Sequence, residues 1–339
     1  MEGLVTKPGF WNGRSVLVTG ASGLIGSWLC ASLLADGARV QGLVRDADPQ
    51  SQLFRSGLFR RMSLVIGDLA DLATVERAIV GWQSETVFHL GAQAVVAVAS
   101  ELPLETFESN IRGTYNVLEA CRRHGSVVGR VVIASSDKAY GSHPALPYTE
   151  DMPLQGRRPY EVSKSCGDLL AACYHETYRL PVGIARCGNV YGGGDLNWSR
   201  LIPDTIRALL NGRPPLIRSD GRYVRDYVYV MDVVEAYRRL AEGLDDEELH
   251  GEAFNFSSER PYEVLEVVDA IQRLMGASRL KPVILDAARG EIRSQFLDST
   301  KAAARLGWSA SYPLEEGLAE TIEWYRAYLA HDDPAEMRD

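Results

Sequence analysis

Five side chains that can exchange protons or donate hydrogen bonds lie within one short part of the sequence. They are Ser136, Asp137, Lys138, Tyr160 and Lys164. Residues four apart on a helix share one face, so Tyr160 and Lys164 should point in the same direction. A hydroxyl, a carboxylate, a phenol and two amines in one place could carry out acid–base chemistry on a bound ligand.

The element that must position these groups is the apolar run at 131–134, which is typical of a buried strand in a parallel sheet. Ser136 to Lys138 would then lie at the carboxyl end of this strand, where open α/β sheets bind their ligands. A simpler interpretation is that Ser136 and Asp137 only cap the next helix and that Tyr-x-x-x-Lys arises by chance. The glycine-rich turn upstream favours the functional interpretation.

This turn follows the β-branched run at 15–19 and opens an amphipathic helix. Its spacing, GxxGxxG, is typical of a dinucleotide site, because glycines let the backbone approach a pyrophosphate and the free N–H groups of the helix N-terminus bind it. The alternative is a tight turn without a ligand. The residues predicted to bind a dinucleotide here are Gly20, Ser22, Gly23, Leu24, Ile25 and Gly26.

Further cofactor contacts are predicted after the next strands of the sheet. Asp46 follows the strand at 39–44 and could accept hydrogen bonds from a ribose 2′-OH, which favours NAD. Arg45 beside it keeps NADP open. Asp68 could contact the adenine amino group or could be a helix N-cap. Leu69, Leu90 and Ala92 complete the predicted set, whereas His89 is predicted to be a satisfied core residue.

The composition excludes several other classes of protein. The net charge is −9 with no basic cluster, which argues against a nucleic acid or an anionic membrane surface as partner. The five cysteines are scattered without a CxxC pair, as expected for a reducing cytoplasm, and no metal site is predicted. No apolar run approaches the roughly 20 residues that span a bilayer, and the N-terminus does not resemble a signal peptide.

The succession of strands and helices predicts an α/β protein with a Rossmann-type, doubly wound parallel sheet and a smaller C-terminal α/β domain. The dinucleotide-binding domain is predicted at 11–186, with 226–256 returning to it. The substrate domain would comprise 187–225 and 257–332. The triple glycine at 192–194 is predicted to be a flexible loop that marks the hinge between them.

These motifs together resemble the extended short-chain dehydrogenase/reductases, in particular the nucleotide-sugar epimerases and dehydratases. The resemblance covers nearly the whole chain. It includes the glycine turn, Ser136 with Tyr160-x-x-x-Lys164, GNVYGGGD at 188–195, RLIPD at 200–204 and LGW at 306–308. Within this group the chain most resembles CDP-glucose 4,6-dehydratases, which share SDK at the catalytic strand end. RDYVYV at 225–230 is closer to the epimerases, and Gly91 replaces a usual alanine.

The resemblance implies a reaction at a sugar ring. Tyr160 would take the proton of a C4 hydroxyl that Ser136 also contacts, and Lys164 with a bound nicotinamide is expected to lower the Tyr160 pKa from about 10. Asp137 would act as the acid that expels the C6 hydroxyl. Lys138 stands where related dehydratases have a glutamate, and it would remove the C5 proton while neutral, a form that neighbouring positive charges favour.

The resemblance also implies NAD as cofactor and a nucleotide-diphospho-sugar as substrate. Asn189, Arg225 and Arg293 resemble positions that bind the diphosphate, with Arg293 the loosest match, and Arg200 is a further candidate. A homodimer through helices near 105–121 and 160–177 is a further expectation. If Asp137 and Lys138 form only an ion pair at the strand end, the enzyme would instead be a UDP-sugar 4-epimerase or a reductase.

Overall fold

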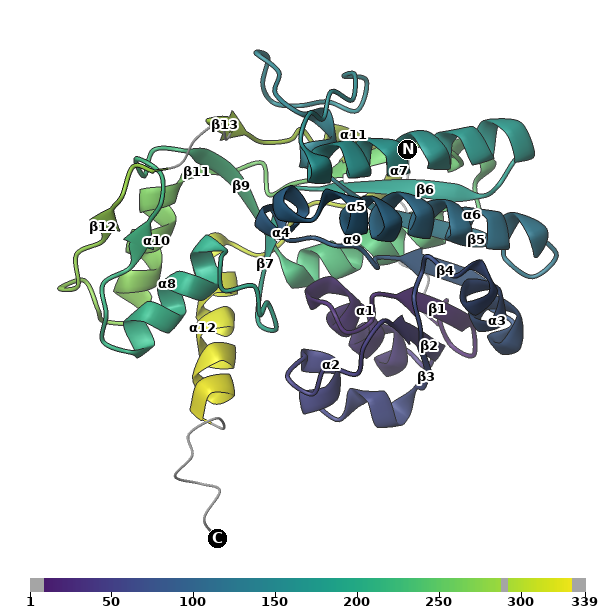
Figure 1. The fold of residues 1–339 in the computed structure, drawn as a ribbon, viewed down its shortest axis with the longest axis horizontal. Helices are drawn as coiled ribbons and strands as arrows, with labels where there is room; N and C mark the ends of the chain where they lie inside the picture. Colours follow the sequence, from purple (N-terminus) through teal and green to yellow (C-terminus); the bar gives the residue numbers. More distant parts are fainter. Residues whose placement is uncertain (1–8, 288–291, 331–339) are drawn as a thin grey trace, which may run out of the picture.

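The computed structural model describes residues 9–287 and 292–330. Its main feature is a sheet of seven parallel strands in the order β10-β6-β5-β4-β1-β2-β3 (Figure 1). The strands are β1 (Ser15–Thr19), β2 (Arg39–Val44), β3 (Ser63–Ile66), β4 (Thr86–His89), β5 (Arg130–Ser136), β6 (Val182–Cys187) and β10 (Ala253–Phe256). This arrangement confirms the predicted Rossmann-type α/β fold.

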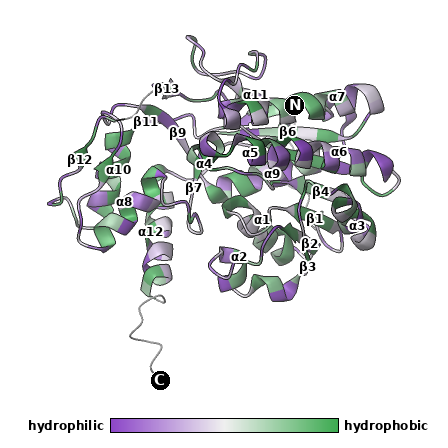
Figure 2. Cartoon of the chain, viewed as in Figure 1, coloured by the Kyte–Doolittle hydropathy of each residue, from purple (hydrophilic) through white to green (hydrophobic). Residues whose placement is uncertain are grey.

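Helices cover both faces of this sheet because its strands are apolar on both sides. In β1, Val16 and Val18 pack on one helical layer and Leu17 packs on the other. The first layer contains α1 (Leu24–Ala35), α9 (Val230–Gly243) and α11 (Thr300–Leu306), and the second contains α3 (Leu72–Trp82), α6 (Gly113–Arg123) and α7 (Pro159–Tyr178). Figure 2 shows hydrophobic residues on the central strands and hydrophilic residues along the outer helices.

A smaller unit is built around β9 (Val224–Tyr229), which pairs with β7 (Asn189–Tyr191), β11 (Pro261–Glu263) and β13 (Ser294–Gln295). A separate pair joins β8 (Leu216–Ile217) to β12 (Val283–Ile284). The helices α8 (Leu201–Leu210), α10 (Val264–Leu274) and α12 (Leu314–Ala330) pack around a third apolar cluster with several tyrosines. This unit lies beside the carboxyl ends of the main strands (Figure 1).

Short elements complete the described chain. They are α2 (Gln52–Arg55), α4 (Val96–Glu101), α5 (Pro103–Phe107), a π-helical turn (Glu108–Arg112) and 3₁₀ turns at Leu58–Arg61, Asp137–Tyr140 and Glu247–Leu249. The chain crosses between the two sheets more than once, because β9 belongs to the smaller sheet while β10 returns to the main one. The domain boundaries given above, 11–186 with 226–256 and 187–225 with 257–332, are still a prediction.

The triple glycine at 192–194 lies at a packed junction between the two units. The Gly193 carbonyl oxygen accepts a 2.7 Å hydrogen bond from the Trp28 side chain on α1. A Cβ at Gly193 would lie 2.3 Å from the Trp324 ring on α12. The expectation of a loose loop is therefore wrong, since glycine is needed here for close packing between two aromatic side chains.

Candidate active site

A cavity of about 1010 Å³ extends along the carboxyl ends of the main strands and continues between the two units. The five residues predicted to be catalytic all line it, as do Asn189, Arg200 and Arg225. The predicted cofactor residues line the same cavity, namely Gly20, Ser22, Gly23, Leu24, Ile25, Gly26, Asp46, Asp68, Leu69, Leu90 and Ala92. The structure therefore brings together side chains that are far apart in the sequence.

The glycine turn at one end of the cavity has the geometry that a dinucleotide requires. Gly20 has a φ of +68°, and a Cβ there would lie 2.7 Å from the backbone nitrogen of Gly91. A Cβ at Gly26 would lie 2.2 Å from the carbonyl oxygen of Gly20, so this glycine lets α1 pack against the turn. Among the described residues, no side chain caps the N-terminus of α1, and its first turn contains no acidic residue. These N–H groups are suited to a pyrophosphate.

Two carboxylates lie near this turn. Asp46 is exposed and forms a 2.9 Å ion pair with Arg45, and both residues line the cavity. Asp68 accepts a 2.8 Å hydrogen bond from the backbone N–H of Ala70, whereas Asp71 caps α3. The interpretation of Asp68 as a helix cap is therefore wrong, and its side chain remains available at the cavity wall.

The backbone after β4 approaches the glycine turn closely. A Cβ at Gly91 would lie 2.5 Å from Cδ1 of Leu69, so Leu69 occupies the space that an alanine methyl group would need. His89 is buried between the hydroxyls of Thr19 and Thr114, at 2.9 and 3.0 Å. Burial lowers the pKa of His89 to about 3, which keeps it neutral. His89 is thus the satisfied core residue that its place in a strand predicts.

At the end of β5 the chain turns into a 3₁₀ helix that presents three polar side chains to the cavity. The Ser136 hydroxyl donates to Asp137 Oδ1 at 2.8 Å and accepts from the Lys138 backbone N–H at 3.2 Å. Lys138 Nζ lies 3.1 Å from both carboxylate oxygens of Asp137. Asp137 is buried, and the Lys138 side chain is 21% exposed. This ion pair is therefore largely shielded from bulk water.

Tyr160 and Lys164 lie on the first turns of α7, with Lys164 Nζ 6.0 Å from the centre of the Tyr160 ring. Lys164 donates a 2.8 Å hydrogen bond to the carbonyl oxygen of Ala134, and burial lowers its pKa to about 8. Burial raises the pKa of Tyr160 to about 12, although Arg200 and a hydrogen bond with Ser136 oppose this effect. The expected lowering of the Tyr160 pKa is thus wrong for the chain alone, because loss of hydration dominates.

The structure places most of the residues expected to bind a diphosphate on the cavity wall, but not Arg293. Arg200 lines the cavity and pairs with Asp195 at 2.9 Å, and Arg225 donates to the backbone carbonyl oxygens of Val224 and Arg293. The Arg293 side chain is 66% exposed and pairs with Asp220 at 3.3 Å, and it does not line the cavity. Its predicted place at the site is therefore wrong in this conformation, because the pairing with Asp220 directs it elsewhere.

Sequence reasoning missed other residues on the cavity wall. Arg218 and Tyr223 lie between β8 and β9 and line the cavity near Arg225. Both lie in the turn-rich segment at 218–225 and in no recognised motif, so only their position in the fold identifies them. Among the described residues, no group of three or more His, Cys, Asp and Glu side chains forms a metal site.

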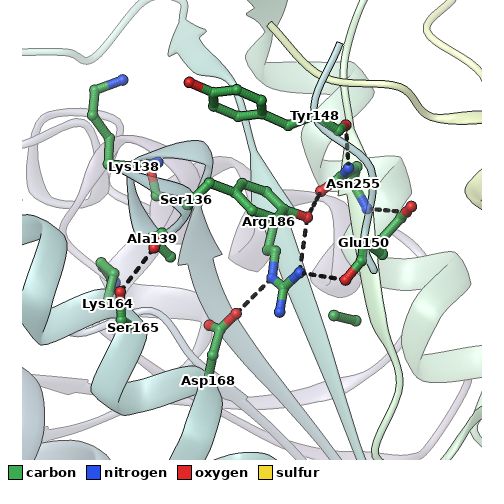
Figure 3. Close-up of polar contacts among 12 residues, drawn as sticks. Ser136, Lys138, Ala139, Tyr148, Glu150, Lys164, Ser165, Asp168, Arg186 and Asn255 are labelled. Carbon is green, nitrogen blue, oxygen red and sulfur yellow. Dashed lines mark hydrogen bonds and ion pairs between the residues drawn. The ribbon is translucent and has the colours of Figure 1, made fainter. Parts of the chain in front are cut away.

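A buried polar network supports the loop that follows the catalytic strand. Figure 3 shows Arg186 at its centre, with hydrogen bonds to Asp168 on α7 at 2.6 Å and to the Tyr140 hydroxyl at 2.8 Å. Tyr140 in turn donates to Asn255 at 2.7 Å, and the Asn255 backbone donates to Glu150 at 2.8 Å. Burial alone would lower the pKa of Arg186, but the charge of Asp168 raises it above its usual value. The Arg186 side chain therefore stays charged inside the protein.

Comparison with known proteins identifies the family. The family model described as GDP-mannose 4,6 dehydratase matches residues 17–321. A CDP-glucose 4,6-dehydratase of Salmonella typhimurium is 33% identical over 340 residues, covering 96% of this chain and 94% of that protein. A UDP-glucose 4-epimerase of Mycolicibacterium smegmatis is 34% identical over 314 residues, covering 91% of this chain and 98% of that protein.

The solved structures agree with these relatives. A dTDP-glucose 4,6-dehydratase from Streptomyces venezuelae with NAD bound has a TM-score of 0.83 and 29% identity, covering 94% of this chain and 99% of that chain. No helix within the described residues is both long and apolar enough to cross a membrane. With its fold, its glycine turn and its Ser136–Tyr160–Lys164 group, the chain belongs to the GDP-mannose 4,6 dehydratase family of nucleotide-sugar dehydratases and epimerases, within the short-chain dehydrogenase/reductases.

Proposed function

We propose that this protein is an NAD-dependent nucleotide-diphospho-sugar 4,6-dehydratase, with CDP-glucose as its preferred substrate. One observation carries the proposal: a largely buried carboxylate–amine pair, Asp137 and Lys138, lies beside Ser136 in the cavity that contains the glycine turn. A 4,6-dehydratase needs an acid and a base besides its oxidising group, whereas a 4-epimerase needs neither. The CDP-glucose 4,6-dehydratase of Salmonella supports the choice of nucleotide.

The cofactor would bind along the glycine turn, with its pyrophosphate at the N-terminus of α1 and its adenosine ribose near Asp46. Asp46 favours NAD over NADP, because a carboxylate accepts from two ribose hydroxyls but repels a 2′-phosphate. When bound, NAD would supply the group that accepts hydride from C4 and later returns this hydride to C6. Lys164 and Tyr160 face this part of the cavity and would orient the sugar against it.

Tyr160 would carry out the first proton transfer, which removes the proton of the C4 hydroxyl. A phenol with a pKa of about 12 is a poor base at neutral pH, so the substrate complex must favour the phenolate. Arg200 already acts in this direction, as does the hydrogen bond with Ser136. Lys164 can reinforce the effect, since an ammonium near the ring stabilises negative charge on its oxygen.

The second stage needs a neutral amine and a protonated carboxylic acid. A single proton transfer along the 3.1 Å contact from Lys138 to Asp137 produces both at once. Lys138 would then remove the C5 proton, and Asp137 would protonate the departing C6 hydroxyl, so that the total charge of the pair is restored.

The nucleotide diphosphate would be held by polar and cationic side chains that line the same cavity. Arg200 and Arg225 supply positive charge, and Arg218 and Tyr223 also line the cavity. Asn189 contributes a buried Nδ2 group that has no hydrogen-bond partner among the described residues. An unpaired buried donor is costly, so a ligand oxygen at this point would relieve the penalty.

A mass measurement separates this proposal from its main alternative. Purified protein is incubated with CDP-, UDP-, dTDP- and GDP-glucose, and the products are analysed by mass spectrometry and NMR. A dehydratase releases one water and gives a 4-keto-6-deoxy sugar. A UDP-sugar 4-epimerase, which the 34% identical relative keeps open, would invert C4 without a change in mass and would overturn the proposal.

A homodimer and a cytoplasmic location complete the proposal. The helices α6 and α7 carry exposed apolar side chains, among them Tyr115, Leu169 and Tyr178, which could pack against a second copy. Light scattering of the purified protein would give its mass in solution. A monomeric mass at working concentration would contradict the dimer without affecting the proposed reaction.

A further inference from the structure

One buried amide contacts both members of the Asp137–Lys138 pair. Gln295 Oε1 accepts a 3.2 Å hydrogen bond from Lys138 Nζ, and Gln295 Nε2 donates a 3.0 Å hydrogen bond to the backbone carbonyl oxygen of Asp137. The Gln295 side chain is only 1% exposed and lies behind the cavity wall. It comes from β13 of the smaller sheet, so it reaches the catalytic strand end from outside the main sheet.

The strand that carries Gln295 is fixed on both sides. Ser294 and Gln295 pair with Val224 and Arg225 of β9. Beyond β13, the chain forms two backbone hydrogen bonds with Tyr148, in which Tyr148 donates to Phe296 and Asp298 donates to Tyr148, each at 2.9 Å. The segment therefore ties the loop after the catalytic strand to β9. Its side chain at 295 has little freedom to move.

The position of Nζ needs such a support. Lys138 has a long, flexible side chain, and its amine must reach one C–H bond of the sugar. Besides Gln295, Nζ contacts the Asp137 carboxylate and, at 3.4 Å, Asn189 Oδ1. Asp137 is expected to change its charge during the reaction, and Asn189 is expected to face the substrate. The amide of Gln295 does not titrate, so its contact with Nζ persists in both protonation states of the amine.

We infer that Gln295 is a positioning residue, which holds Lys138 Nζ in place for removal of the C5 proton and fixes the backbone of Asp137. The inference rests on the proposed dehydratase function. It assigns a step-specific role to a residue of the smaller sheet, in which Asn189 and Arg225 are proposed to contact the substrate. Gln295 also connects Lys138, the proposed base, with Arg225, because Arg225 lies on β9 directly opposite Gln295.

The test measures two steps of the reaction separately. Oxidation at C4 is followed by the transient absorbance of reduced nicotinamide, and C5 proton removal is followed by deuterium incorporation in D₂O. Gln295→Leu should lower C5 exchange by about tenfold to a hundredfold and change C4 oxidation by no more than about twofold, because a displaced base affects only its own step. Gln295→Glu should act in the same direction, since its charge holds Lys138 as an ammonium and its oxygen repels the Asp137 carbonyl.

Gln272 offers a matched control, because it is also a buried glutamine but binds the backbone of Leu280 outside the cavity. Gln272→Leu should leave the ratio of the two rates unchanged, whatever its effect on thermal stability. If both steps slow together in Gln295→Leu and Gln295→Glu, or if neither changes, Gln295 has only a structural role. If the unaltered enzyme shows no C5 exchange, the dehydratase function itself is wrong, and the role of Gln295 is wrong with it.

Discussion

The hydroxyl of Ser136 donates a hydrogen bond of 2.8 Å to the carboxylate of Asp137. This contact joins two groups that are proposed to act in different steps, because Ser136 contacts the hydroxyl that is oxidised and Asp137 acts in the elimination. The same Ser136 oxygen also accepts from the Lys138 backbone. The turn after β5 is therefore one hydrogen-bonded unit, and replacing one of its residues should change the positions of the others.

Ser136→Ala tests this connection. We expect both C4 oxidation and C5 exchange to slow by about tenfold or more, because the variant loses a contact with the substrate and one with Asp137. Ser136→Thr keeps the hydroxyl and serves as the matched control, with both rates closer to those of the unaltered enzyme. Transient kinetics of reduced nicotinamide and deuterium exchange measure the two steps. Unchanged oxidation and exchange in Ser136→Ala would show that neither step depends on this hydroxyl.

Replacing the proposed base gives a step-specific prediction. In Lys138→Met, oxidation at C4 should persist while C5 exchange stops, so reduced nicotinamide should accumulate after mixing with substrate. The physical reason is that methionine preserves much of the side-chain length, but its sulfur does not accept a proton near neutral pH. Lys281→Met, at an exposed lysine, is the control. Continued exchange in Lys138→Met would remove Lys138 from the role of base.

The order of elements and the outline of the cavity could be predicted because they depend on local patterns. The β-branched strand at 15–19, the glycines after it and the apolar strand before Ser136 each specify their own conformation. In a parallel sheet the carboxyl ends of the strands then meet at one edge. Nearly all the predicted residues reached the cavity for this reason.

Contacts that depend on the smaller sheet could not be predicted in this way. Arg293 matched a motif loosely, but its side chain pairs with Asp220. Gln295, two residues further on, is in no motif, and its hydrogen-bond partner Lys138 lies 157 positions away in the sequence. The pKa of Tyr160 was expected to fall because its charged neighbours were visible in the sequence, whereas its burial was not.

The pKa of Lys164 leads to a prediction about stability. Burial lowers this pKa from 10.5 to about 8, so between these values the unfolded chain holds a proton that the folded chain has released. The free energy of unfolding should therefore rise with pH through this window, by up to about 3 kcal/mol, because the cost of burying the charged Lys164 amine disappears. Urea unfolding of the unaltered protein and of Lys164→Met at about pH 8 and about pH 10 measures the effect.

The comparison between variants isolates this contribution from other titrating groups. The unfolding free energy of the unaltered protein should rise relative to that of Lys164→Met as the pH increases. Lys281→Met should show no such change with pH. A constant difference between the unaltered protein and Lys164→Met would mean that Lys164 keeps its ordinary hydration in the folded state.

The buried pair of Arg186 and Asp168 should be costly to break from either side. Their side chains are 8% and 2% exposed, and the contact measures 2.6 Å. Arg186→Met or Asp168→Leu alone would leave one buried charge unpaired, and each should lower the unfolding free energy by about 3–5 kcal/mol. The double variant should lose less than the sum of the two, because neither charge remains.

A double-mutant cycle by urea unfolding measures this coupling. The exposed pair of Arg273 and Asp269 provides the control, and its removal should cost less than about 1 kcal/mol since water screens both charges. Additive losses in the Arg186–Asp168 cycle would contradict the prediction. Such additivity would mean that Arg186 contributes mainly through Tyr140 and the Glu150 carbonyl oxygen, which it also contacts, and that these bonds hold the loop after the catalytic strand.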